Sequence, residues 1–385
     1  MGRTRSKKTK TVNEINPQAL EDENSFVHIP LDLVIEIVGR LPSKSVARFL
    51  LVSKSWETFI RSRDFITSFP LGSSSQPRLL ITFSDFDYRV RSDFDYRVRR
   101  QTLDFFSSSS SSATSLISRF TRTSPDLKEY LPHFVNGLIS IGFGEEQIIY
   151  NPSTGRSISL PNLVTTRTMI RTYFGYDPVN DQYKVLCLTR SLVYKVFTLG
   201  ERESWREMDC SIPHLPWSYN GLCIDGVLYY LAFTEEEMLQ QRLMRFDVRS
   251  EKLELLTDLP ADLMSPYPYT LIKYDGKVAI ATKALTYTFD VWVMEEHGWL
   301  KTSFSIEPYC TSLQIESIHV KGTTRMGEFI LAPFRARNAF YVVFYNPKRN
   351  SCRNIKIEVN SDYEFGAQYP KLIVLSDYVE NIRFF

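Results

Sequence analysis

LCIDGVLYY, at residues 222–230, has a similar stretch in LIKYDGKVAI at residues 271–280, with the same Asp-Gly pair at its centre. In both copies an Asp-Gly pair separates two short runs that are rich in aliphatic and aromatic residues. Because glycine tolerates the positive φ of a tight turn, each copy predicts a β-hairpin. A hairpin that recurs within one chain indicates a β fold built from repeated units.

A second unit, strand–turn–strand, recurs beside the hairpins, for example as IIYNPSTG at residues 148–155 and VFYNPKRN at residues 343–350. One apolar marker position can be chosen in each unit, and neighbouring markers lie roughly 50 residues apart. Four strands in such an interval are the signature of a propeller blade. The spacing predicts five blades, marked by Tyr150, Phe197, Phe246, Val293 and Tyr345.

Further predicted strands lie at both ends of this region, at residues 78–83 and 102–106 before it and at 371–375 and 381–385 after it. Together they would form a sixth blade, and closing the ring would remove exposed sheet edges. We therefore expect a large all-β domain at residues 78–385 with a six-bladed, kelch-like β-propeller fold. A β-sandwich or an irregular barrel is the alternative.

Residues 26–70 show a helical pattern instead. Leu33, Ile37 and Leu41 recur at spacings of four, so one helical face is apolar. Pro42 should end this first helix, because the residue before a proline avoids the helical region.

Two further helices are expected in this module, one with Val46 and Phe49 and one with Trp56. Ser43 or Ser45 is placed to cap the first of these two. Three short helices make only a marginal core, so such a module usually depends on a partner. The chain is thus expected to be multidomain, with a small all-α module ahead of the β domain.

The remaining segments are polar. Residues 1–25 form a charged stretch that we expect to be a disordered tail, read as a nuclear address; N-myristoylation is the alternative. Residues 71–77 are the expected linker. The octapeptide SDFDYRVR at residues 84–91 is repeated at residues 92–99, which predicts a lengthened hairpin, and a serine run at residues 107–112 predicts a flexible loop.

Composition excludes several classes of function. The 385 residues are 43% hydrophobic and 23% charged with a net charge of +2, so neither nucleic acid nor a membrane is an expected partner. Five cysteines without a CxxC pair indicate no zinc site and no disulfide framework. Scattered histidines and the lack of catalytic motifs predict a non-enzyme without cofactors.

Three stretches of the helical module follow a known pattern: IPLDLVIEI at residues 29–37, RLPSKSVARF at 40–49 and VSKSW at 52–56. Together they resemble the F-box, and the match spans the module. The resemblance implies binding to the Skp-type adaptor of an SCF-type ubiquitin ligase, and through it to a cullin.

The β domain carries NPSTG at residues 151–155, FGYDPVNDQYKVL at 174–186 and DGVLYYLA at 225–232. These stretches resemble the plant F-box-associated domain, which holds the protein to be ubiquitinated. The resemblance implies a non-catalytic substrate-recognition subunit that works in the nucleus, the cytoplasm or both. The alternative is an adaptor-binding or orphan interaction module that does not serve degradation.

The helical module has more apolar residues than so small a core needs, so some should face the adaptor. The alternative for Phe49, Val52 and Trp56 is that they only fill the core. The candidate adaptor-binding residues are Ile29, Pro30, Leu31, Leu33, Ile37, Leu41, Pro42, Val46, Phe49, Val52 and Trp56.

In a propeller, the loops between blades and the loops between second and third strands share one face. Aromatic and arginine side chains in these loops are favoured hot-spot types, so we expect this face to hold the target protein. The candidate target-binding residues are Arg167, His214, Trp217, Tyr219, Met264, Tyr267, Tyr269, Arg335 and Arg337.

Overall fold

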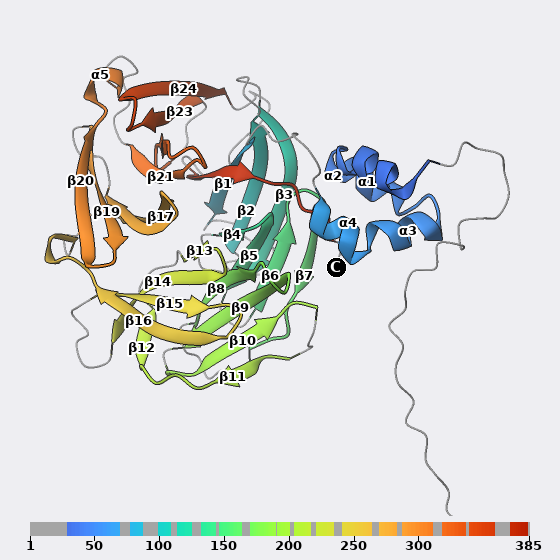
Figure 1. Cartoon of the computed structure of the whole chain (residues 1–385), viewed down its shortest axis with the longest axis horizontal. Helices are drawn as coiled ribbons and strands as arrows, with labels where there is room; N and C mark the ends of the chain where they lie inside the picture. The colour runs from blue at the N-terminus through green and yellow to red at the C-terminus, as the bar shows by residue number, and fades with distance from the viewer. Residues whose placement is uncertain are drawn as a thin grey trace, which may run out of the picture.

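The described part of the chain contains six β-sheets and five short α-helices, four of them in the N-terminal module and the fifth, α5 (Glu307–Cys310), in the β domain (Figure 1). A 3-10 turn lies at Ala261–Leu263. None of these helices is long and apolar enough to cross a membrane. The computed structural model describes residues 29–69, 78–87, 99–108, 114–124, 132–143, 146–163, 170–189, 191–200, 204–216, 221–234, 241–263, 269–282, 287–310, 318–335, 339–358 and 370–383. The predicted linker at residues 71–77 and the tail at residues 1–25 lie outside them.

The helical module, residues 29–69, contains α1 (Leu31–Gly39), α2 (Ser43–Phe49), α3 (Lys54–Ile60) and α4 (Arg63–Ser68). The prediction of three helices was therefore wrong. The fourth begins at Ser62, whose side chain accepts a hydrogen bond from the Phe65 backbone N–H, as Ser53 does for Trp56 at the start of α3. Such capping satisfies an N–H that has no partner inside the helix.

The β domain is a six-bladed propeller, as expected, and its strands run antiparallel within each blade. Counted from the first strand of each blade outward, the first blade has β4 (His133–Val135), β5 (Leu138–Phe143), β6 (Glu146–Asn151) and β7 (Arg156–Ser159), and the second has β8 (Ile170–Asp177), β9 (Gln182–Thr189), β10 (Tyr194–Thr198) and β11 (Arg206–Met208). The third has β12 (His214–Pro216) with β13 (Leu222–Ile224), then β14 (Val227–Thr234), β15 (Gln241–Asp247) and β16 (Lys252–Asp258), and the fourth has β17 (Tyr269–Tyr274), β18 (Lys277–Thr282), β19 (Thr288–Glu295) and β20 (Gly298–Ser305). The fifth has β21 (His319–Thr323), β22 (Phe329–Ala332), β23 (Ala339–Asn346) and β24 (Ser351–Glu358), and the sixth, closing blade has β25 (Lys371–Tyr378), β1 (Arg78–Asp87), β2 (Arg99–Ser108) and β3 (Thr114–Ser124).

The repeated sequence units have the predicted positions in the blades. All five marker residues, from Tyr150 to Tyr345, lie on the third strand of their blades. The two Asp-Gly pairs form the predicted hairpin turns: Asp225 and Gly226 have φ values of 47° and 87°, and Asp275 and Gly276 have 45° and 81°. Positive φ at both central positions is the requirement of a tight type I′ turn.

The sixth blade closes the ring with strands from both ends of the domain, as predicted. β25 pairs with β1, for example Val374 with Ile81. Two details of the prediction were wrong. Residues 381–383 do not form a strand, and the outer strand is β3, which follows the serine run and was not predicted. The duplicated octapeptide begins within β1 and ends at the first residue of β2, and residues 88–98, on which the predicted lengthened hairpin depends, lie outside the described residues.

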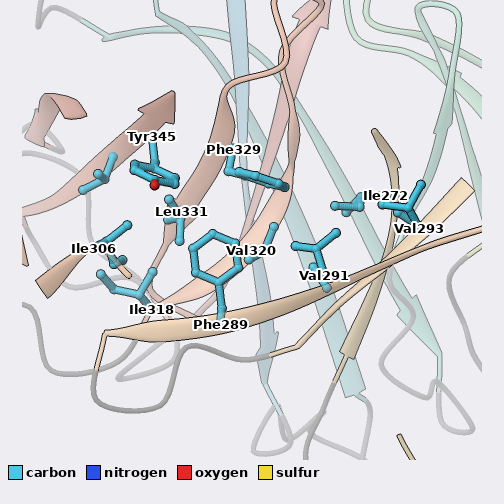
Figure 2. Close-up of a cluster of buried hydrophobic side chains, with 13 residues drawn as sticks. Ile272, Phe289, Val291, Val293, Ile306, Ile318, Val320, Phe329, Leu331 and Tyr345 are labelled. Carbon is cyan, nitrogen blue, oxygen red and sulfur yellow. The ribbon is translucent and has the colours of Figure 1, made fainter. Parts of the chain in front are cut away.

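Packed hydrophobic side chains fill the space between neighbouring blades. In Figure 2, Phe289 and Val291 of β19 face Phe329 and Leu331 of β22, with Ile272 beside them. All five are almost fully buried. A propeller sheet is covered on both sides by other blades, which explains why its inner strands are near-continuous apolar runs rather than alternating ones.

The two faces of the propeller differ in what they carry. The antiparallel order puts the turns between first and second strands, and between third and fourth strands, on one face. We call this the junction face, because the helical module contacts its turns. The opposite face, here the distal face, carries the connections between blades and those between second and third strands.

The segment that follows β25 joins the propeller to the helical module. Ile382, only 1% exposed, lies in the core of the helices together with Val38, Val46, Ile60 and Phe65. Figure 1 marks the C-terminus beside α4. A residue from the far end of the sequence thus completes a core that four short helices do not fill alone.

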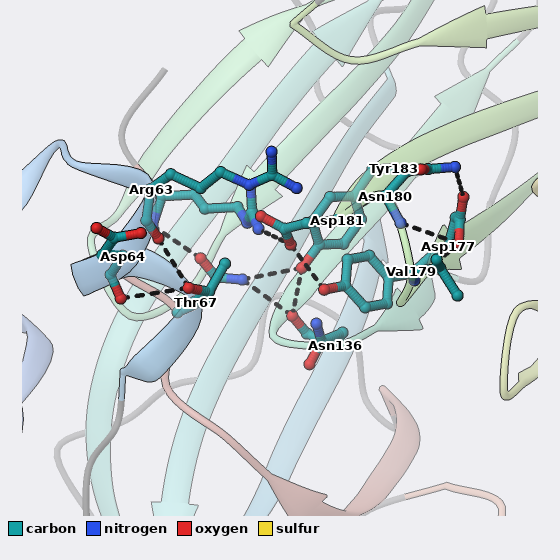
Figure 3. Close-up of polar contacts among 12 residues, drawn as sticks. Arg63, Asp64, Thr67, Asn136, Asp177, Val179, Asn180, Asp181 and Tyr183 are labelled. Atoms are coloured by element: carbon teal, nitrogen blue, oxygen red, sulfur yellow. Dashed lines mark hydrogen bonds and ion pairs between the residues drawn. The ribbon is translucent and has the colours of Figure 1, made fainter. Parts of the chain in front are cut away.

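Polar contacts hold the same segment against the junction face. The Asn381 side-chain amide donates to the Asn136 carbonyl and to the Tyr183 hydroxyl, each at 3.0 Å. The Arg383 guanidinium pairs with Asp181, and burial raises the pKa of Tyr183. Figure 3 shows Asp181, Tyr183 and Asn136 gathered beside α4. The segment is fixed by directed bonds as well as by burial.

The cap of α2 also comes from this segment. We expected Ser43 or Ser45 to supply it, but neither side chain makes a cap hydrogen bond, and that prediction was wrong. Instead, the Ser43 backbone N–H donates to the Glu380 carboxylate at 2.6 Å. A carboxylate at this end of a helix also interacts favourably with the helix dipole.

Replacing Ile382 with alanine should selectively destabilise the helical module. Removing a buried isoleucine side chain costs about 2–5 kcal/mol, and Ile382→Val only about 1 kcal/mol. Hydrogen exchange of the α1–α4 amides would report this loss separately from the propeller amides. Unchanged protection of α1–α4 in Ile382→Ala would show that the helices do not depend on the segment.

Candidate functional site

Several apolar side chains of the helical module are exposed to solvent, and we call this set the outer apolar face. Most of the residues predicted to bind an adaptor belong to it, namely Ile29, Pro30, Leu31, Leu33, Ile37, Pro42 and Val52. Apolar residues gathered in this way on so small a module are typical of a protein-binding surface.

Helix α1 is apolar on two sides. Val38 is buried in the module core and Val34 packs against it, whereas Leu33 and Ile37 point outward and are about half exposed. A helix that is apolar on both sides needs cover on both. Within the described residues, only the inner side of α1 has it.

The turn between α2 and α3 adds the most exposed part of this face. Leu51 is 88% exposed and Val52 is 66% exposed. Leu51 was not among the predicted residues. One indication of its exposure was present in the sequence: Leu51 lies beside Val52 in a turn, where an apolar side chain has no helical face on which to pack.

The other predicted adaptor-binding residues contribute to the core. Val46 is completely buried, and Leu41, Phe49 and Trp56 are partly buried against the same cluster. The Trp56 ring lies 4.8 Å from the Phe49 ring, measured between centroids. Of the three residues for which core packing was the alternative, Phe49 and Trp56 pack against this cluster and Val52 is exposed.

His214, one of the predicted target-binding residues, is completely buried. Its Nε2 atom lies 2.7 Å from the Tyr230 hydroxyl and its Nδ1 atom 2.7 Å from the Ile212 carbonyl. Burial lowers the pKa of His214 to about 4, so the ring is neutral at physiological pH. In this conformation its side chain bonds to groups of its own blade and is closed off from solvent.

Tyr269 and Arg335 lie on the distal face, as the sequence predicted. Tyr269 is partly buried at the start of β17, and Arg335 is exposed in the connection between β22 and β23. The remaining predicted residues lie outside the described part of the chain: Arg167, Trp217, Tyr219, Met264, Tyr267 and Arg337.

Two family models match the chain. One, described as the F-box domain, matches residues 26–68, and the other, described as the F-box associated beta propeller domain, matches residues 78–379. Together they cover the helical module and all six blades.

Similar proteins are found in Arabidopsis thaliana. The F-box protein At4g11590 is 47% identical over 98% of this chain and 98% of its own length. The putative F-box protein At1g26515 is 48% identical over 90% of this chain and 100% of its own. A chain in the crystal structure of a nidogen/laminin complex matches with a TM-score of 0.44 and 8% identity, over 77% of this chain and 98% of that chain, a likeness too distant to carry an argument.

Core and surface residues of the helical module should respond differently to substitution. Val46→Ala should lower the free energy of unfolding by about 2 kcal/mol, because it leaves a cavity. Leu51→Ser should change it by less than about 0.5 kcal/mol, because that side chain is in water already. Denaturant unfolding checks both values, and a large loss in Leu51→Ser would mean that Leu51 packs inside the protein.

Proposed function

The chain belongs to the plant F-box proteins with an associated β-propeller, and from this premise we propose that it is the substrate-recognition subunit of an SCF-type ubiquitin ligase. The F-box would bind the Skp-type adaptor and the propeller would bind a target protein. F-box proteins are generally non-catalytic subunits, and the other subunits of the ligase would transfer ubiquitin.

The outer apolar face of the F-box carries this proposal. Leu51 and Val52 project into solvent from the α2–α3 turn, and α1 adds Leu33 and Ile37. A stable protein interface buries about 1,600 Å² and concentrates its energy in a few apolar or aromatic anchors. This face offers such anchors on a surface that the propeller leaves open.

The arrangement of the two domains also supports the proposal that the F-box binds the adaptor and the distal face binds the target. The F-box sits on the junction face, through contacts such as Ser43 with Glu380 and Lys44 with the Ile117 carbonyl. The distal face therefore points away from the F-box. A target bound there would be held at a fixed position relative to the adaptor, which raises its effective concentration near the ubiquitin donor.

The second candidate function is that of an adaptor-binding or orphan interaction module. Such a module would make the same contact with the adaptor but would not lead to degradation of a target. The outer apolar face fits both readings, since it concerns only the adaptor. We propose action in the nucleus or cytoplasm, where the ubiquitin ligase subunits work.

Binding to a purified Skp-type adaptor tests the proposal directly. The full chain should bind it, and Leu51→Ser with Val52→Ser should weaken binding by roughly tenfold or more, as expected for interface anchors. Leu300→Ser is the matched control, because Leu300 is an exposed leucine on the propeller strand β20. No binding by the folded wild-type chain would overturn the proposal.

Protein turnover separates the two readings. If the chain serves a ligase, proteins captured by its propeller should be stabilised in cells that express the Leu51→Ser, Val52→Ser variant. Their half-lives would be compared by pulse-chase with those in cells that express Leu300→Ser. Equal half-lives, with adaptor binding lost only in the first variant, would favour the module that does not serve degradation.

A further inference from the structure

Basic side chains surround one exposed aromatic ring on the distal face. We call this group the Phe334 cluster; it consists of His319, Lys321, Phe334, Arg335 and Lys371. Its members come from the start of β21, from the connection between β22 and β23, and from the start of β25. Three segments that are distant in the sequence thus converge where the fifth blade meets the closing blade.

The geometry of the cluster is set by the backbone. The Leu372 N–H donates to the Phe334 carbonyl at 2.9 Å, and Arg335 forms a β-bridge with Lys371. The Nζ atoms of Lys321 and Lys371 lie 5.6 Å and 5.8 Å from the centroid of the Phe334 ring. The His319 ring lies 5.3 Å from the same ring, measured between centroids.

Lys321 is the most unusual member. Its Nζ donates to the Leu372 carbonyl at 2.8 Å, and within the described residues no carboxylate lies within ion-pair distance of it. Other enclosed cations of this chain have such a partner, as Lys184 has Glu251 at 2.7 Å. Burial lowers the pKa of Lys321 to about 7. A partly desolvated ammonium group of this kind gains most from an added anion.

Phe334 offers a second kind of contact. Its side chain is 40% exposed although two lysines lie against the ring. The ring can therefore receive an apolar side chain while the Lys321 ammonium group beside it receives an anionic one. A polypeptide can present an anionic and an apolar side chain close together, as the Lys321 Nζ atom and the Phe334 ring would require.

We propose that the Phe334 cluster is the part of the distal face that recognises the target, and that it takes a protein segment carrying carboxylate or phosphate side chains. This inference rests on the proposed function and gives the target its chemical character. A nucleic acid fits less well, because the chain has a net charge of only +2 and the cluster presents a single exposed ring for stacking.

Fluorescence anisotropy with short labelled peptides tests the proposal on the purified full chain. Three probes share one length: a glutamate-rich peptide, a phosphoserine peptide, and a neutral peptide with glutamine and serine in their place. At least one anionic peptide should bind roughly tenfold more tightly than the neutral one. Binding of the glutamate peptide would identify carboxylates as sufficient, and binding of the phosphoserine peptide alone would identify phosphate.

Three variants locate the site. Lys321→Met removes the charge but keeps an unbranched apolar stem, and Lys371→Gln removes the second cation; each should weaken anionic peptide binding by roughly tenfold. Lys301→Gln is the matched control, because Lys301 also lies over an aromatic ring, at 5.0 Å from the Trp292 centroid, but on the outer strand β20. It should leave peptide binding unchanged.

Equal affinity for the three peptides would overturn the inference, as would an equal loss in Lys301→Gln. Binding of a labelled single-stranded oligonucleotide that depends on Lys321, without discrimination among the peptides, would overturn it in favour of nucleic acid. Adaptor binding is measured on the same samples. If peptides fail and the adaptor binds, only this inference falls; if the adaptor fails to bind, the proposed function falls.

Discussion

Antiparallel pairing of β25 with β1 is the interaction on which the rest of the structure depends. It closes the ring by uniting strands from both ends of the domain in one blade, so that the inner edge of β1 is paired. It also delivers the following segment to the F-box, where Ile382 enters the core and Glu380 caps α2. Without this pairing, the propeller would open and the helices would lose part of their core together.

The consequence is a fixed link between the two surfaces for which we propose different partners. Asn381 and Arg383 hold the segment to turns of two neighbouring blades, through the Asn136 carbonyl and Asp181. The outer apolar face and the distal face are therefore held at opposite ends of one body. A bound target and a bound adaptor would keep a constant geometry, which favours ubiquitin transfer to those lysines of the target that lie within reach.

Local patterns in the sequence predicted most of the fold. The Asp-Gly turns and the marker residues at regular intervals located four strands per blade, because hairpins depend on residues that are close in sequence. The strands at both ends predicted ring closure. The contacts between the helices and the segment after β25 were not predicted: nothing near Ile382 indicates that it enters a helical core, and nothing near Ser43 indicates a cap from Glu380.

The candidate sites divide in the same way. Exposed apolar positions such as Leu33 and Ile37 could be predicted from helical spacing, because the module has more apolar residues than its core needs. The burial of individual residues could not be predicted. His214 is of a type that often binds partners, but it is completely buried, and the exposed Leu51 was missed because a turn has no periodicity. The Phe334 cluster joins three separate segments of the chain. Of its residues, only Arg335 was predicted to bind the target.

The segment that completes the F-box core lies near the C-terminal end of the sequence, so the order of synthesis affects when the F-box can be completed. Ser43 and Glu380 are 337 residues apart, so the ribosome makes the helices long before it makes the residues that complete them. At typical elongation rates the delay is on the order of tens of seconds. During that time the nascent helices lack Ile382 in their core, and chaperones would meet them in this unsupported state. Only a chain translated through all six blades carries a completed F-box, so under the proposed function finished molecules would bind the adaptor in preference to incomplete ones.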